Sequence, residues 1–171
     1  AESLQRLYGI HSTVIPNAHR LPDSNASQRR SILWVGRSAD FKHPERFLRL
    51  AEAFPDEDFV MVCQQATGDT QYDALRSQAE KIDNLEFLQR VRFDTIDGYF
   101  ERAKVFVNTS DSEGFANTFI QACKAGTAIL SYQVNPDGFL DAHGCGLACG
   151  GDEEQMQTTL GELLRHERYL E

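Results

Sequence analysis

Short runs of apolar residues alternate with amphipathic stretches along most of the chain. The first run, residues 31–35, reads Ser-Ile-Leu-Trp-Val and is followed by a glycine. A short continuous apolar run of this kind is typical of a strand that is buried on both faces of a parallel sheet. The same pattern predicts further strands at residues 58–63, 85–88, 104–107 and 128–130, and a short sixth strand at residues 147–148.

Between these runs, apolar residues recur at the spacing of a helix. The first such stretch begins at Pro44 and continues to Phe54. Proline suits the first turn of a helix, because the N–H group that it lacks would have no partner there. The pattern predicts further helices at residues 72–82, 95–103 and 115–125, the last ended by Gly126, and a final helix from residue 153 to about residue 168.

Repeated alternation of buried strands and helices predicts the fold class. We expect an α/β protein with a single Rossmann-like, doubly wound parallel sheet of about six strands and helices on both faces. A sheet of this kind binds its ligands at the carboxyl ends of the strands. Candidate chemistry is therefore expected just after each apolar run.

Residues 1–30 have a different pattern from the rest. A short helix is predicted at residues 2–8 and an extended piece at residues 13–15, whereas residues 21–30 are polar and typical of a loop. We interpret residues 1–30 as an entry segment that arrives from an upstream domain, and residues 31–171 as the folded domain. A length of 171 residues suits one such domain and is too short for two of full size.

Charge and composition argue against several classes of function. The formal net charge is −9, whereas proteins that bind nucleic acids usually carry a basic patch, so we expect no nucleic-acid partner. No apolar run approaches the roughly 20 residues that a membrane-spanning helix needs. The first residues also lack the basic start and apolar stretch of a signal peptide. We therefore expect a cytoplasmic protein.

The cysteines give no sign of a disulfide framework or of a metal site. The four cysteines form no Cys-x-x-Cys pair, and their scatter fits reduced thiols in a cytosolic protein. His143, Cys145 and Cys149 could be imagined as metal ligands. Their spacing differs from the usual zinc patterns, so we expect no metal here.

Two cations follow the first predicted strand. Gly36 would permit a tight turn at the end of that strand, and Arg37 and Lys42 would then lie at the ligand edge of the sheet. Two cations at this edge suit a ligand that carries phosphate. The alternative interpretation is that both side chains are simply solvated at the surface.

A second candidate segment follows the strand at residues 104–107. Gly114 and its small neighbours predict a loop that leads into a helix. The first N–H groups of that helix, from about Ala116 to Thr118, have no partner within the helix and could hold a diphosphate. Glu113 could accept hydrogen bonds from sugar hydroxyls, or it could only favour the helix dipole. Asp111 and Glu113 could also bind a metal, although such pairs are common in loops.

Four segments together resemble the C-terminal domain of the retaining glycosyltransferases of group 1, or family 4, which have the GT-B fold. They are Val-Ile-Pro-Asn at residues 14–17, Val-Gly-Arg at residues 35–37 with Lys42, Asn-Leu-Glu-Phe-Leu at residues 84–88, and Ser-Asp-Ser-Glu-Gly-Phe-Ala-Asn-Thr-Phe-Ile-Gln-Ala-Cys-Lys-Ala-Gly at residues 110–126. The order and spacing of the four are specific, and the resemblance covers nearly the whole chain. No Gly-x-Gly-x-x-Gly, P-loop or nucleophile elbow is present.

The resemblance implies an enzyme that moves a sugar from a nucleoside-diphosphate donor to an acceptor with retention of configuration. This chain would be its nucleotide-sugar-binding half. An N-terminal domain, missing here, would hold the acceptor, which could be a glycan, a lipid or a small molecule. We therefore expect the isolated domain to bind the donor and to transfer nothing. The resemblance implies no metal or other cofactor, and it leaves membrane association of the full-length protein open.

The resemblance also implies roles for individual residues. Arg37 and Lys42 would contact the diphosphate and offset the charge that builds on it, while Glu113 would contact the transferred sugar. These three residues are the predicted catalytic set. The residues predicted to bind the donor are Gly36, Arg37, Lys42, Arg90, Val91, Glu113, Gly114, Phe115, Ala116, Asn117, Thr118 and Gln121, with Arg90 and Val91 near the base.

Three positions depart from the family pattern. The second glutamate of the family, which accepts hydrogen bonds from both ribose hydroxyls, is Gln121 in this chain, and a neutral acceptor holds hydroxyls more weakly than a carboxylate. Ala18 and Gln89 replace two glycines. Gln121 favours the main alternative, which is a nucleotide-sugar-binding or scaffolding relative without catalysis.

A further alternative is a sugar-nucleotide epimerase with the same two-domain fold. Such an enzyme needs acid and base side chains in its cleft. His43 and His143 are the candidates, but a surface histidine is the simpler interpretation of each.

Overall fold

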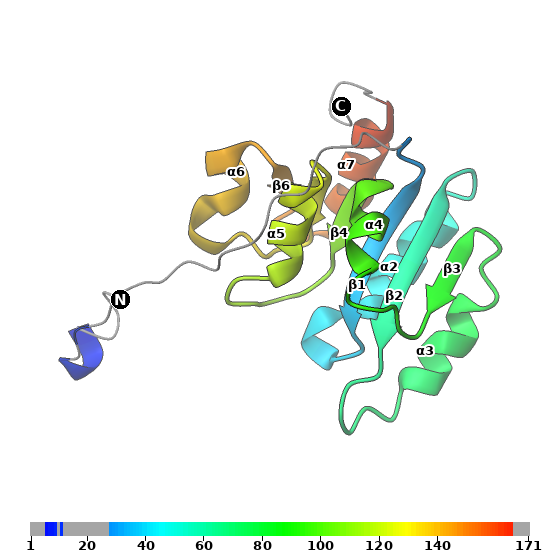
Figure 1. Cartoon of the computed structure of the whole chain (residues 1–171), viewed down its shortest axis with the longest axis horizontal. Coiled ribbons are helices and arrows are strands. Elements are labelled where there is room, and N and C mark those ends of the chain that lie inside the picture. The colour runs from blue at the N-terminus through cyan, green and yellow to red at the C-terminus, as the bar shows by residue number, and fades with distance from the viewer. Residues whose placement is uncertain (1–5, 10, 12–27, 166–171) are drawn as a thin grey trace.

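The computed structural model describes residues 6–9, 11 and 28–165, and their centre is a six-stranded sheet in which every strand pair is parallel (Figure 1). The strands lie in the order β3-β2-β1-β4-β5-β6. Their bounds are β1 (Ser31–Arg37), β2 (Asp58–Gln64), β3 (Leu85–Leu88), β4 (Ala103–Asn108), β5 (Ala128–Ser131) and β6 (Gly146–Ala148). The predicted fold class is confirmed.

Helices connect the strands and cover both faces of the sheet (Figure 1). They are α2 (Pro44–Ala53), α3 (Tyr72–Ala79), α4 (Ile96–Glu101), α5 (Asn117–Lys124), α6 (Phe139–His143) and α7 (Glu153–Arg165), with the short 3₁₀ turns η1 (Asp40–Lys42) and η2 (Pro136–Gly138). Buried residues of α2, α3 and α7 belong to one apolar cluster, and buried residues of α4, α5 and α6 belong to a second.

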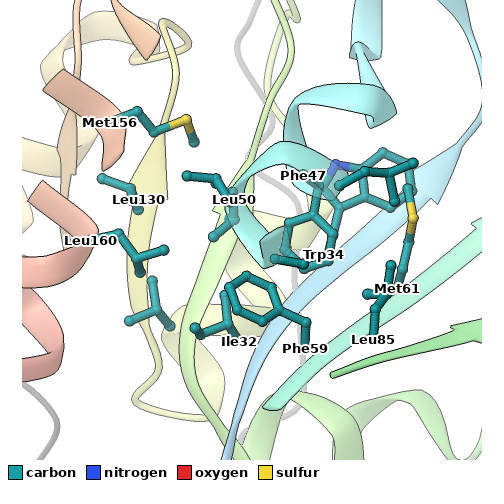
Figure 2. Packing of buried hydrophobic residues seen from close by; sticks show 14 of the residues in the cluster. Ile32, Trp34, Phe47, Leu50, Phe59, Met61, Leu85, Leu130, Met156 and Leu160 are labelled. Atoms are coloured by element: carbon teal, nitrogen blue, oxygen red, sulfur yellow. The ribbon is translucent and has the colours of Figure 1, made fainter. Parts of the chain in front are cut away.

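The two clusters arise because successive side chains of a strand point to opposite faces. In β1, Ile32 and Trp34 belong to the cluster that contains α2, and Leu33 belongs to the cluster that contains α5. Figure 2 shows residues of the first cluster, in which the rings of Phe47 of α2 and Phe59 of β2 pack edge-on with their centres 5.3 Å apart. Burying one such side chain stabilises the fold by about 1.5–3 kcal/mol, so the continuous apolar runs of the sequence are what hold the sheet between its two helical layers.

The end of β1 corrects the role that the sequence predicted for Gly36. Gly36 and Arg37 continue the strand and pair with Cys63 and Gln64 of β2, and Gly36 does not have a positive φ. It is therefore not a turn residue. A Cβ atom at this position would lie 2.8 Å from the indole of Trp34 and 3.3 Å from Cδ of Lys42. The absence of a side chain lets these two residues pack across the strand.

Three helices have a boundary that differs from the prediction by two residues or more. α3 ends at Ala79 instead of residue 82, and α4 spans only Ile96–Glu101. α5 begins at Asn117, two residues later than predicted, and Gly126 stops it with a φ of 63° as expected. α6 was not predicted, because its five residues, between the left-handed Gly138 and Gly144, are too few to show a helical period.

Most of the predicted entry segment lies outside the described residues. This applies to residues 1–5 and 12–27 and to the predicted end of the last helix beyond residue 165, whereas residues 6–8 are helical. At the start of the domain, the guanidinium of Arg29 donates to the carbonyls of Ala103 and Ala125, both at 2.8 Å. Within the described residues, no helix combines the length and the apolar character that crossing a bilayer would require.

Candidate functional site

The strand order marks the place where a ligand would bind. The chain passes from β1 outward to β2 and β3, and it then returns to β4 on the other side of β1. The loops after β1 and β4 therefore leave in opposite directions along the same sheet edge. In parallel α/β sheets this switch point opens a crevice that holds ligands. Both segments that the sequence singled out follow these two strands.

The switch point holds a half-buried ion pair. Oε1 of Glu113 accepts hydrogen bonds from Nζ of Lys42 at 2.9 Å, from Nδ2 of Asn108 at 3.0 Å and from Oγ of Ser110 at 2.5 Å. The side chains of Lys42 and Glu113 are 18% and 14% exposed. All three donors use the same oxygen, so Oε2 accepts no hydrogen bond from any described residue and remains available.

These contacts set the charge of Glu113. Burial alone would raise the pKa of its carboxyl. The hydrogen bonds from Ser110, Lys42 and Asn108 and the positive charge of Lys42 together outweigh burial, so the pKa lies below its usual value. Glu113 is therefore a carboxylate at neutral pH. The sequence had predicted a role for Glu113 and Lys42 separately, and the structure brings the two side chains into contact.

Buried hydrogen bonds join the loop after β1 to the loop after β4. Nε1 of Trp34 donates to Oγ1 of Thr109 at 2.8 Å, and that hydroxyl donates to the carbonyl of Lys42 at 2.5 Å. The backbone N–H of Asp111 donates to the carbonyl of Phe41 at 2.9 Å. The backbones that carry Lys42 and Glu113 are thus fixed to each other before any ligand arrives.

Arg46 of α2 also holds the loop after β4 in place through hydrogen bonds. Its Nη1 donates to the carbonyl of Thr109 at 2.9 Å and to Oδ1 of Asp111 at 2.7 Å. Its guanidinium lies 3.8 Å from the centre of the Tyr132 ring, and its Nε donates to Glu153 of α7 at 3.2 Å. Sequence reasoning missed this residue, because an arginine on a helix carries no local sign of its partners.

Asp111 and His43 have structural partners. Nε2 of His43 lies 2.6 Å from Oδ2 of Asp111, and Nδ1 lies 2.9 Å from Glu45. The hydrogen bond from Arg46, with a further one from His43, lowers the pKa of Asp111. His43, which the sequence interpretation treats as a surface histidine, is 30% exposed and has a carboxylate at each of its ring nitrogens. No group of three or more His, Cys, Asp or Glu among the described residues is arranged to hold a metal ion.

Arg37 differs from Lys42 in having no partner. It is the last residue of β1, its side chain is exposed, and it makes no hydrogen bond or ion pair with any described residue. An unpaired guanidinium at the switch point is free to bind an anion bidentately.

The start of α5 faces the same crevice. Its N-cap is Ala116, and no side chain caps the helix. A Cβ atom at Gly114 would meet nothing within 4 Å, so the loop is open on that side. Phe115 is partly exposed and packs edge-on against Phe139 of α6, with the ring centres 5.0 Å apart. Asn117 and Thr118 begin the helix one residue later than the predicted anion-binding segment.

The remaining predicted residues lie farther from the ion pair. Arg90 and Val91 follow β3, two strands from β1, and line an open hollow of about 590 Å³ with Arg92, Phe93 and Asp94. Gln121 lies one turn into α5, where its Nε2 is 3.4 Å from Oδ1 of Asp97 on α4. The structure therefore places the predicted segments along the same edge of the sheet. The hydrogen bond between Lys42 and Glu113 joins the segment after β1 to the segment after β4.

A model of the family described as glycosyl transferases group 1 matches residues 29–166. The chain belongs to the group 1 glycosyltransferases. The predicted membership of group 1 is confirmed, since the match covers most of the chain, and solved glycosyltransferase structures share the predicted fold. A comparison with curated proteins gave no match.

Solved structures share the fold of this group 1 glycosyltransferase at low sequence identity. S. aureus TarM matches 99% of this chain with 14% identity and a TM-score of 0.78, and sucrose-phosphate synthase from Thermosynechococcus elongatus matches 83% with 18% identity and a TM-score of 0.71. The chain covers 36% and 38% of those proteins. It covers 79% of the C-terminal domain of the group 1 protein LpcC from Francisella tularensis, which matches 84% of this chain with 17% identity and a TM-score of 0.67.

Proposed function

We propose that this group 1 glycosyltransferase chain is the nucleotide-sugar-binding part of a retaining enzyme of family 4. In this proposal it binds a nucleoside-diphosphate sugar whose sugar is passed to an acceptor. The observation that carries the proposal is the pair of Lys42 and Glu113 at the switch point of the sheet, with Nζ and Oε1 2.9 Å apart. The pair lies next to an unpaired arginine and an uncapped helix start.

The diphosphate would lie between the cations and the start of α5. Arg37 offers a free fork of N–H donors, Lys42 a point charge, and the first N–H groups of α5 a partial positive charge. As the bond between sugar and phosphate breaks, negative charge builds on the leaving diphosphate. Fixed cations at that place stabilise the charge more than they stabilise the ground state. These groups supply the positive charge without a metal, so we propose no cofactor.

Glu113 would act on the sugar. Its Oε1 is occupied by Lys42, Asn108 and Ser110, whereas Oε2 is left to accept a hydrogen bond from a sugar hydroxyl. The carboxylate also neutralises Lys42 until a donor binds. The base would extend toward the loop after β3, where Arg90 and Val91 line the open hollow. TarM, which shares the fold, was solved with UDP, and this favours a nucleoside diphosphate as the class of ligand.

The acceptor would be held by another domain. The chain spans less than two fifths of the length of TarM and of sucrose-phosphate synthase, and its described residues form a single sheet. We propose that a glycan, a lipid or a small molecule enters from a second domain that closes over the switch point, and that the chain by itself binds the donor without transferring the sugar.

Calorimetric titration of the chain with UDP, GDP and ADP tests the proposal. We expect one nucleotide to bind and Arg37→Ala to weaken that binding about tenfold or more, because a charge-assisted pair to phosphate is lost. Glu113→Gln is expected to leave the affinity for the nucleotide nearly unchanged and to weaken binding of the matching nucleotide sugar.

Arg30→Ala is the matched control. Arg30 lies just before the opposite end of β1 and is also exposed. Among the described residues, its side chain donates a hydrogen bond only to Gln28. Its loss should not change the titration. Binding of none of the three nucleotides, or equal loss in the Arg30 and Arg37 variants, would overturn the proposal.

A further inference from the structure

A carboxylate on α4 faces α5, the helix whose start belongs to the proposed phosphate site. Asp97 lies in the first turn of α4, and α4 and α5 pack side by side (Figure 1). Its Oδ1 is 3.4 Å from Nε2 of Gln121, and its Oδ2 accepts from Nζ of Lys124 at 3.1 Å. Two side chains on consecutive turns of α5 thus converge on one carboxylate of the neighbouring helix.

The contact fixes the orientation of the Gln121 amide. A carboxylate only accepts hydrogen bonds, so the amide must turn its NH₂ group toward Asp97, and its carbonyl oxygen is left as a free acceptor. Each oxygen of Asp97 accepts one bond from α5 and keeps further lone pairs, and the side chain is 51% exposed. Asp97 and Gln121 together therefore present several acceptors to solvent, held by donors from α5.

A simple surface ion pair would not need this arrangement. An exposed pair of this kind contributes about 0–1 kcal/mol to stability. Here the side chain of Lys124 is only 14% exposed, and Gln121 adds a second donor to the same acceptor. The result is a carboxylate whose direction is set while half of its surface stays open.

Gln121, which contacts Asp97, lies about one helical turn beyond the start of α5, a separation that suits the next group along a nucleotide. α5 begins at Asn117, and Gln121 lies four residues farther, or about 6 Å along the helix axis. A ribose follows the phosphates of a nucleotide at a similar separation and carries two neighbouring hydroxyls. Both hydroxyls are hydrogen-bond donors, and a charged acceptor holds them more strongly than a neutral one.

We propose that Asp97, held by Gln121 and Lys124, accepts hydrogen bonds from the 2′- and 3′-hydroxyls of the donor's ribose. The inference rests on the proposed function, since it places the diphosphate at Arg37, Lys42 and the start of α5. It makes Asp97 a specificity-determining residue, and it gives Gln121 the role of a positioning residue that orients the carboxylate on α4. The site then keeps a negative charge, on Asp97, although residue 121 is a glutamine where the family has a glutamate.

The test compares a nucleoside diphosphate with its 2′-deoxy form. The nucleotide is whichever of UDP, GDP and ADP binds the wild-type chain. We expect the wild-type chain to prefer the ribonucleotide about tenfold, as the loss of a hydrogen bond to a charged group implies. Asp97→Asn should lower the affinity for the ribonucleotide about tenfold and reduce that preference to about threefold or less. Asp97→Asn binding both nucleotides as the wild-type chain does would overturn the proposal.

Exchanging the carboxylate and the amide between residues 97 and 121 tests which helix must carry the charged acceptor. Gln121→Glu alone places a second carboxylate beside Asp97 and should weaken binding through repulsion between like charges. Gln121→Glu combined with Asp97→Asn reverses the donor and the acceptor, and it should recover most of the preference for the ribonucleotide. A gain in affinity from Gln121→Glu in the presence of Asp97 would instead assign the ribose to α5 and overturn the role of Asp97.

Two measurements keep this proposal apart from the proposed function. Asp73→Asn, in the first turn of α3, removes a similar exposed charge at a distant helix start and should change neither nucleotide binding nor thermal unfolding. Arg37→Ala is titrated in parallel. If Arg37→Ala weakens nucleotide binding while Asp97→Asn does not, the phosphate site is supported and the proposed role of Asp97 is wrong. If the wild-type chain binds no nucleotide, both the proposed function and the proposed role of Asp97 are wrong.

Discussion

The loops after β4 and β3 both open onto the carboxyl edge of the sheet, but they are held in different ways. The loop after β4 is tied to β1, η1 and α2 through Trp34, Lys42 and Arg46. In the loop after β3, Arg92 and Asp94 pair with each other at 2.6 Å while their side chains are 81% and 60% exposed. Phe93 between them is 92% exposed.

This difference separates two tasks of a donor site. Groups that act on developing charge must be in place before the reaction, because reorganising them would cost free energy at the transition state. The loop that carries Glu113 has this character. A loop with few buried contacts can change conformation at little cost, which suits recognition of a base that takes no part in the chemistry.

The largest change in stability is expected when the contacts that hold the loop after β4 are removed. Arg46→Ala leaves the carbonyl of Thr109 without its donor, removes one of the two partners of the Asp111 carboxylate and uncovers the ring of Tyr132. We expect the free energy of unfolding to fall by about 2–4 kcal/mol, measured by chemical denaturation. Arg49→Ala is the control, since its half-exposed side chain pairs only with Glu153, and it should cost at most about 1 kcal/mol. Equal losses in the two variants would remove the contrast between the loops.

An intermediate effect is expected from pH. The pKa of Glu113 is depressed in the folded chain relative to its ordinary value of 4.5. A depressed carboxyl stabilises the fold fully above its unfolded pKa, and this contribution is lost as the pH falls through the folded pKa. The free energy of unfolding should therefore drop below about pH 4.5. The drop should be shallower in Glu113→Gln, and identical pH profiles for the two proteins would show that the carboxylate is not held as described.

The smallest effect is expected in the loop after β3. Arg92→Ala removes an ion pair that is fully open to water, so thermal unfolding should not change measurably. If the loop contacts the base, the same variant should alter the relative affinities for UDP, GDP and ADP without abolishing binding of the diphosphate. A marked fall in the unfolding temperature would show that this loop, too, is structurally fixed, and it would end the comparison.

The sequence determined the parts of this protein that depend on local pattern. Continuous apolar runs predicted the strands, since a strand buried on both faces must be apolar at every position. The polar residues after the first and fourth strands predicted that Arg37, Lys42 and Glu113 lie at the ligand edge of the sheet, because the carboxyl ends of parallel strands share that edge. The family motifs named the same residues, and the family itself is confirmed.

Only the tertiary structure decided which polar side chains meet and why certain residues are needed. Arg46 and Asp111 are 65 residues apart in the sequence, and Asp97 and Gln121 are 24 apart. Their contacts depend on the strand order and on which helices share a face. Gly36 looked like a turn, but its lack of a side chain makes room for Trp34 and Lys42. Local patterns report burial, whereas pairing between distant residues is fixed only when the sheet and its helices have packed.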